Sequence, residues 1–295
     1  MGIFTNVLKT ALLLGALMGL CLGLGYAFGG ERGLIIGFLL GGGMSAVSYF
    51  FSDKIALASV GAQAVTREQA PELYSMVETL AQRAGIPTPR LYVAPAQAPN
   101  AFATGRNPKN GVVCVTAGLM SMMDSQELQG VLAHELSHIK HRDILIATIA
   151  AVIAGAISMM AHMAMWFGGG YGRRDRSSSP LDLVALIAMM LFAPLAAGLI
   201  QMAISRSREY AADARGAQLA GGPEGLISAL KKLETANRQI PMNVTPSQSH
   251  MFIVKPLPAR AVGEGVSSLF RTHPPTEQRI AKLIQLMGRP NPYAG

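Results

Sequence analysis

The segment Val131-Leu132-Ala133-His134-Glu135-Leu136-Ser137-His138 is the starting point for interpreting the whole chain. It contains the pattern His-Glu-x-x-His in a run whose apolar residues recur at helical spacing, which predicts a helix. Two histidines four residues apart lie one turn apart on the same helix face, so both imidazole rings can reach one metal ion. Glu135 would then stand beside a water molecule on that metal. A zinc hydrolase needs this arrangement.

The composition of the 295-residue chain indicates a membrane protein. Half of its residues are hydrophobic, only 14% are charged and the mean hydropathy is positive. In typical soluble domains about a quarter of the residues are charged. The formal net charge is +8, but the basic residues are scattered and not clustered with aromatic ones. This pattern argues against a nucleic-acid partner and fits a solvated surface that faces an anionic lipid leaflet. The two cysteines, Cys21 and Cys114, imply no disulfide framework.

Four runs without charged residues predict two apolar helical hairpins. The first pair comprises residues 10–30 and 33–52, which only Glu31 and Arg32 separate, and the second comprises residues 144–172 and 183–205. Each run has about the length that a bilayer-spanning helix requires.

Each hairpin has an alternative interpretation. The first run could be a cleaved signal peptide, but it is long for one and a second apolar run follows at once. The second pair could be a buried helical hairpin of a soluble domain, although its length favours the membrane. Lys9 and Lys54 flank the outer ends of the first hairpin, against Arg32 in its loop, which predicts that both ends face the cytoplasm. Arginines in the loop of the second hairpin leave open whether that hairpin crosses completely.

The remaining segments predict helices and short strands around the metal motif. Helices are expected at residues 66–84, from about 124 onward, at 224–237 and at 276–287, strands at 91–93, 100–104 and 112–115, and a turn at 105–111. Asp124 followed by Glu127 predicts a capping box at the start of the motif helix. The strand at residues 100–104 is also a candidate sheet edge that could bind an extended substrate by backbone pairing.

A catalytic zinc usually has three protein ligands, so the two motif histidines need a partner. His141 follows His138 by three residues, which places it on the flank of the site, and a polar interfacial residue is the better interpretation. Glu209 on a second helix is the stronger candidate. Asp213, one turn further on, could accept a hydrogen bond from the outer nitrogen of a ligand histidine. Taken alone, this acidic pair would also fit a solvated helix surface, so the residues by themselves leave the third ligand open.

Four motifs, in their order along the chain and with this layout of apolar runs, resemble the HtpX family. They are Asn-Ala-Phe-Ala-Thr-Gly at 100–105, His-Glu-Leu-Ser-His at 134–138, Glu-Tyr-Ala-Ala-Asp at 209–213 and Thr-His-Pro-Pro-Thr-Glu-Gln-Arg at 272–279. The family comprises heat-shock zinc proteases of the bacterial inner membrane, related to the CAAX-prenyl endopeptidases, and the resemblance covers nearly the whole chain. Asn100-Ala101-Phe102 also resembles the substrate-binding edge strand of thermolysin-like peptidases.

The resemblance implies one Zn²⁺ per chain, held by His134, His138 and Glu209, with Glu135 as the general base. It also implies a multi-pass protein of the bacterial cytoplasmic (inner) membrane whose active site faces the cytoplasm. Its expected activity is the degradation of misfolded or damaged membrane proteins, as part of protein quality control and the stress response.

The resemblance further implies that Asn100 contacts substrate, with Ala101 and Phe102 beside it. His273 and Arg279 match a family motif, but no role follows for them from the sequence. The expected partners are membrane-protein and unfolded polypeptide substrates and the lipid bilayer, without nucleic acid, and self-cleavage or a homo-oligomer stays open. A specific processing protease and a non-enzymatic membrane chaperone or scaffold are the alternative functions.

The predicted fold class is a mainly α membrane protein in which two hydrophobic hairpins accompany an α+β, gluzincin-like zinc protease domain with a small β-sheet. Residues 1–52 form the first hairpin and residues 144–205 the second. Residues 53–143 and 206–295 are expected to supply the two parts of the catalytic domain.

Overall fold

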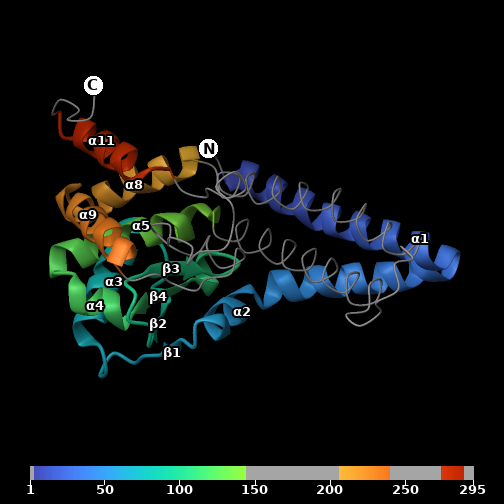
Figure 1. Cartoon of the computed structure of the whole chain (residues 1–295). Coiled ribbons are helices and arrows are strands. Elements are labelled where there is room, and N and C mark those ends of the chain that lie inside the picture. Colours follow the sequence, from blue (N-terminus) through green and yellow to red (C-terminus); the bar gives the residue numbers. More distant parts are fainter. Residues whose placement is uncertain (1–2, 144–205, 240–273, 289–295) are drawn as a thin grey trace, which may run out of the picture.

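The computed structural model describes residues 3–143, 206–239 and 274–288 (Figure 1). The second apolar pair and His273 lie outside these residues. In chain order the described elements are α1 (Ile3–Phe50), α2 (Ser52–Ser59), β1 (Gln63–Ala64), α3 (Pro71–Ala84), β2 (Arg90–Ala94), β3 (Ala101–Thr104), the 3₁₀ helix η1 (Pro108–Asn110), β4 (Val112–Thr116), α4 (Ala117–Met122), α5 (Ser125–His141), α8 (Arg206–Ala220), α9 (Glu224–Gln239) and α11 (Thr276–Leu286). These elements confirm the prediction of a mainly helical chain with a small sheet.

Helix α1 is a hairpin of two helical arms. The helical geometry breaks at Gly30, whose φ of 55° and ψ of −137° lie outside the helical region and suit a residue without a Cβ. The two arms run side by side and project away from the sheet and its covering helices (Figure 1). Within the described residues, no single helix combines the length and hydropathy of a membrane span, but the bent pair Gly30–Val47 and Ser52–Ser59, at 71° to each other, meets that test together.

The four-stranded sheet has the order β1-β2-β4-β3. Strand β2 runs parallel to β4, while β1 and β3 lie antiparallel to their neighbours. The register of the last pair places Phe102 opposite Cys114. All three predicted strands are confirmed, and β3 is an edge strand as expected.

The structure corrects the predicted start of one helix and adds another. The helix expected from residue 66 begins only at Pro71, because proline suits the first turn of a helix. Before it, the Thr66 amide donates to Gln69 Oε1 in a local turn. The short helix α4 was not predicted, since its cap is the last residue of β4: the Leu119 amide donates to Thr116 Oγ1. The predicted turn at 105–111 contains η1.

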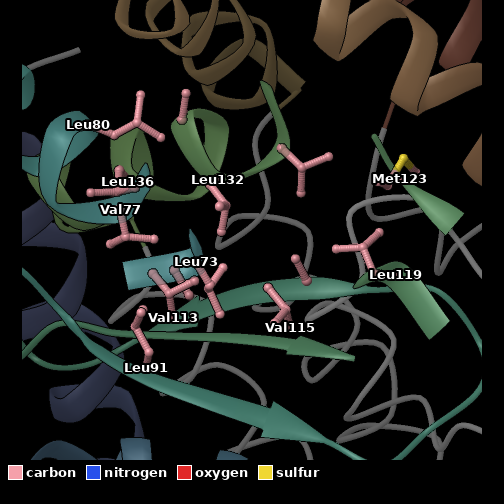
Figure 2. Close-up of a cluster of buried hydrophobic side chains, with 14 of the residues drawn as sticks. Leu73, Val77, Leu80, Leu91, Val113, Val115, Leu119, Met123, Leu132 and Leu136 are labelled. Atoms are coloured by element: carbon pink, nitrogen blue, oxygen red, sulfur yellow. The ribbon is translucent and has the colours of Figure 1, made fainter. Parts of the chain in front are cut away.

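Helix α5 lies at the centre of the core. Leu132 and Leu136 on its inner face are fully buried. Helices α5 and α3 together cover one face of the sheet. Figure 2 shows this for Val77 of α3, which lies above Val113 of β4. Helices α8 and α9 pack on the other sides of α5, and α11 packs on α8 and α9. The helix that carries the metal motif is therefore held from all sides.

The first turn of α5 is tied to α9 by a buried carboxylate. The predicted capping box is present: Asp124 Oδ1 accepts from the Glu127 amide, and Glu127 Oε2 accepts from the Asp124 amide, both at 2.9 Å. The same Glu127 accepts hydrogen bonds of 2.6 Å from Ser228 Oγ and from Lys232 Nζ on α9. Glu127 is only 2% exposed, and these partners give the buried carboxylate the cation and donors that a buried charge requires.

Candidate metal centre

Helix α5 places both motif histidines and Glu135 in the interior. His134 is 1% and Glu135 6% exposed, and His138 is partly exposed. The two rings meet edge to face, with their Nε2 atoms 3.2 Å apart. The four-residue spacing therefore brings both Nε2 atoms to one point, as the helical geometry predicts.

Helix α8 brings Glu209 to the same point. Its Oε2 lies 3.7 Å from His134 Nε2 and its Oε1 lies 3.7 Å from His138 Nε2. The approach depends on Gly216, where a Cβ would lie only 2.9 Å from His134 Cα and N. A larger residue there would push α8 off the backbone of α5, so a glycine two turns after Glu209 lets the carboxylate reach the histidines.

These three residues fit a zinc ion. One ligand atom from each of His134, His138 and Glu209 lies within 4.8 Å of the others. Ligand atoms at tetrahedral positions about 2.0–2.1 Å from a zinc ion would be roughly 3.3 Å apart, close to the 3.2 and 3.7 Å separations above. His141 does not join them: its Nδ1 lies 2.8 Å from the Ser137 carbonyl oxygen. Two imidazoles and one carboxylate are a donor set typical of catalytic zinc sites.

A carboxylate lies behind each histidine. Asp213 Oδ1 is 2.9 Å from His134 Nδ1, and Asp143 Oδ2 is 3.3 Å from His138 Nδ1. In the neutral imidazole such contacts place the proton on Nδ1 and leave the lone pair of Nε2 available to a metal. The sequence analysis named Asp213 but missed Asp143. The available signal was an acidic residue just past the end of the motif helix.

Arg279 on α11 acquires a role that the sequence alone did not provide. Its Nε and Nη2 donate to the two oxygens of Asp213 at 2.8 and 2.7 Å, and Nη2 lies 3.5 Å from His134 Nδ1. Arg279 is 1% exposed, so it is a buried cation that neutralises the carboxylate behind His134. The third helix of the site is thus joined to the ligands through one ion pair.

The pKa values follow from burial and from these pairs. Burial raises the pKa of the Asp213 carboxyl, but the charge and hydrogen bonds of Arg279 outweigh it and lower this pKa to about 2. Burial chiefly lowers the pKa of His134. For His138, burial acts in the same direction, but the hydrogen bond to Asp143 and the charge of Glu209 outweigh it and raise the pKa to about 9. Burial raises the pKa of Glu135 to about 7, which suits a group that exchanges protons near neutral pH.

Glu135 faces the outer edge of β3, the last strand in the sheet order. The Thr116 amide donates to the Asn100 carbonyl, and alternate residues of an antiparallel strand share this orientation. The backbone of Phe102 therefore pairs with β4, whereas Ala101 and Ala103 direct their backbone groups away from it. Accordingly, the Ala103 amide hydrogen-bonds to the Glu135 carboxylate. The outer edge of β3 and the acid beside the metal ligands thus lie next to each other.

The structure separates the three residues predicted to bind substrate. Asn100 is 3% exposed, and its amide donates to Thr116 Oγ1. The Phe102 side chain packs with Ala56 and Leu57 of α2 on the sheet face opposite α5. Of the three, only Ala101 directs its backbone groups away from β4. Ala103, which the sequence analysis did not single out, is the residue beside Glu135.

Comparisons with known proteins agree with this geometry. Residues 67–286 match the family model described as Peptidase family M48. A Protease HtpX homolog of Desulforapulum autotrophicum is 51% identical, over 94% of this chain and 89% of that protein, and one of Persephonella marina is 50% identical, over 96% and 98%. The crystal structure of S. mikatae Ste24p shares the fold with a TM-score of 0.55 at 18% identity, over 95% of this chain and 66% of that one. The chain therefore belongs to peptidase family M48, among the HtpX proteases, as its motifs predicted.

Proposed function

We propose that this protease is a zinc-dependent endopeptidase that degrades misfolded or damaged membrane proteins. The observation that carries the proposal is the convergence of His134, His138 and Glu209 beside Glu135 at the outer edge of β3. Zinc in this site would polarise the scissile carbonyl and lower the pKa of a coordinated water molecule. The residues of the chain supply positioning and proton transfer.

Glu135 is the proposed general base and acid. With a pKa raised to about 7, its carboxyl can take a proton from the attacking water molecule and later deliver it to the leaving amine. The Ala103 amide holds the carboxylate at the strand edge. A substrate in extended conformation would pair with the outward backbone groups of Ala101 and Ala103 and so pass directly beside Glu135.

The α1 hairpin supports a membrane substrate. It projects from the part of the molecule that holds the site (Figure 1), and its exposed side chains include Leu39 and Phe38, at 66% and 59% exposure. Exposed apolar residues on a long hairpin fit a lipid environment. With Lys9 and Lys54 at the outer ends of the hairpin, the site would face the cytoplasm, in the inner membrane of a bacterium.

The decisive experiment compares the purified full-length protein with Glu135→Gln in detergent. The wild type should bind one zinc ion per chain and cleave casein and a denatured membrane protein. Glu135→Gln should keep the zinc and lose about 10²–10⁴-fold in rate. Glu127→Gln, which removes another buried carboxylate from α5, should keep the cleavage. Undiminished cleavage by Glu135→Gln would contradict the proposed mechanism.

Further measurements address the third ligand, the substrate class and the orientation. Glu209→Ala should bind zinc more weakly, and full occupancy in that variant would reject Glu209 as a ligand. Cleavage of a single defined sequence, with denatured membrane proteins left intact, would indicate a processing protease instead. Zinc binding without any proteolysis would indicate a chaperone or scaffold. Substrate added to sealed inverted membrane vesicles should be cleaved, whereas cleavage only in right-side-out vesicles would reverse the proposed orientation.

A further inference from the structure

We propose that Asp143 is a positioning residue for His138, which it holds in the orientation and tautomer that metal binding requires. The inference rests on the proposed zinc function and deepens it. Asp143 is 8% exposed, and its Oδ2 lies 3.3 Å from His138 Nδ1. It would serve His138 as Asp213 serves His134.

The two nitrogens of His138 point in different directions. Nε2 faces His134 Nε2 at 3.2 Å and Glu209 Oε1 at 3.7 Å, whereas Nδ1 faces Asp143. In neutral imidazole one nitrogen carries the proton and the other a lone pair. A proton on Nδ1 that is donated to Asp143 leaves the lone pair of Nε2 directed at the site. A histidine without this acceptor could adopt either tautomer and rotate.

The backbone at the end of α5 brings Asp143 to His138. In a continuous helix a residue five positions on lies about 140° around the axis, so it could not reach the ring. Helix α5 instead ends at His141, and Arg142 adopts left-handed angles of 58° and 29°. Among the described residues, Arg142 is the only non-glycine with positive φ. L-residues disfavour this conformation, and here it turns the following carboxylate back toward the helix.

A buried cation also lies near Asp143. Arg208 of α8, which is 5% exposed, lies where the charges of Asp143 and Glu209 both act on it. Arg208 is therefore a buried cation that favours the charged form of both carboxylates.

The test compares Asp143→Ala and Asp143→Asn with Asp124→Ala in the full-length protein. Asp124 caps the other end of α5, so its loss weakens the same helix without touching the site. We expect Asp143→Ala to raise the zinc Kd about 10–100-fold and to lower kcat with little change in KM. The visible absorption of the Co²⁺-substituted protein should also change, because it reports ligand geometry. Asp124→Ala should lower Tm but leave the zinc Kd and the Co²⁺ spectrum unchanged.

The outcomes separate this inference from the proposed function. A wild-type zinc Kd and Co²⁺ spectrum in Asp143→Ala, together with an inactive Glu135→Gln, would overturn the role of Asp143 and leave the zinc protease intact. A wild type that binds no zinc would overturn both. If Asp143→Ala does not fold, Asp143→Leu decides, because its side chain has a similar shape but no acceptor for the imidazole N–H, whereas the amide oxygen of Asp143→Asn keeps an acceptor and should retain part of the zinc affinity. A wild-type zinc Kd in Asp143→Leu would overturn the inference.

Discussion

Arg279 Nε and Asp213 Oδ2 are 2.8 Å apart, in a two-pronged ion pair that joins α11 to α8 inside the protein. Both side chains are almost fully buried. Asp213 in turn lies 2.9 Å from His134 Nδ1, so the last described helix reaches the metal centre through one carboxylate. The ion pair therefore links the stability of the fold to the orientation of His134.

Replacing Arg279 by Met should destabilise the protein strongly. The change leaves the Asp213 carboxylate buried without its cation, which typically costs about 3–5 kcal/mol. Thermal and chemical unfolding in detergent would measure the loss. The matched control is Gln285→Met on the same helix, an exposed position where a change within about 0.5 kcal/mol is expected. Equal stability of the two variants would show that the pair contributes little.

Gly216→Ala should weaken both the fold and the zinc site. An alanine Cβ would lie 2.9 Å from His134 Cα and N, so α8 must move away from α5. We expect a loss of about 1–3 kcal/mol and a higher zinc Kd, since Glu209 moves with α8. In an unhindered helix the same substitution stabilises by about 1 kcal/mol, so the sign of the change is diagnostic. Gln218→Ala, at an exposed position of α8, should affect neither property, and a stabilised Gly216→Ala would contradict the close approach.

In the metal-free protein, Glu135 should contribute stability that is lost as the pH rises from about 5 to 7, whereas the lowered pKa of His134 acts in the opposite direction below 6.5. The pKa of Glu135 is raised from 4.5 to about 7, so between these values the folded state binds more protons than the unfolded state and the free energy of unfolding falls with pH. The full contribution is about 3 kcal/mol. The pKa of His138, raised from 6.5 to about 9, acts in the same direction at higher pH: its contribution is complete below 6.5 and disappears by about 9.

Unfolding of chelator-treated protein at pH 5, 6 and 7 would measure this dependence. Glu135→Gln cannot titrate at this position, so it should lose less stability than the wild type over that interval. Asp213 does not confuse the comparison: with its pKa lowered to about 2, it contributes stability that disappears only as the pH falls below its unfolded value. Parallel curves for wild type and Glu135→Gln would show that Glu135 has an ordinary pKa.

Ala103→Pro should impair cleavage while preserving the sheet. The Ala103 amide points away from β4 toward Glu135, and an outward N–H on an edge strand is a position where proline is tolerated. Without that donor, Glu135 loses the hydrogen bond that holds its carboxylate, and we expect kcat/KM for casein to fall at least about tenfold. Ala103→Ser keeps the amide and should keep the activity. Wild-type kcat/KM in the proline variant, with intact folding, would show that Glu135 does not need the Ala103 amide.

The sequence analysis succeeded where interactions are local. The capping box at Asp124 and Glu127, the shared helix face of His134 and His138, and the three strands all depend on residues close together in the chain. Helical periodicity and strand alternation express such short-range geometry. The predicted start of α3 failed because periodicity continued past the point where Pro71 begins the helix. Helix α4 was missed because its cap belongs to the preceding strand.

By itself, the sequence determined the pair of histidines on one helix face, the acid beside them and, through the order of its motifs, the family. Tertiary structure decided what surrounds them: Glu209 at the histidines through the close approach at Gly216, Arg279 on Asp213, Asp143 behind His138, and Ala103 beside Glu135. These contacts join residues on different elements or across a helix end. Their geometry depends on how α5, α8, α11 and the sheet pack, and packing of distant segments leaves no periodic signal in the sequence.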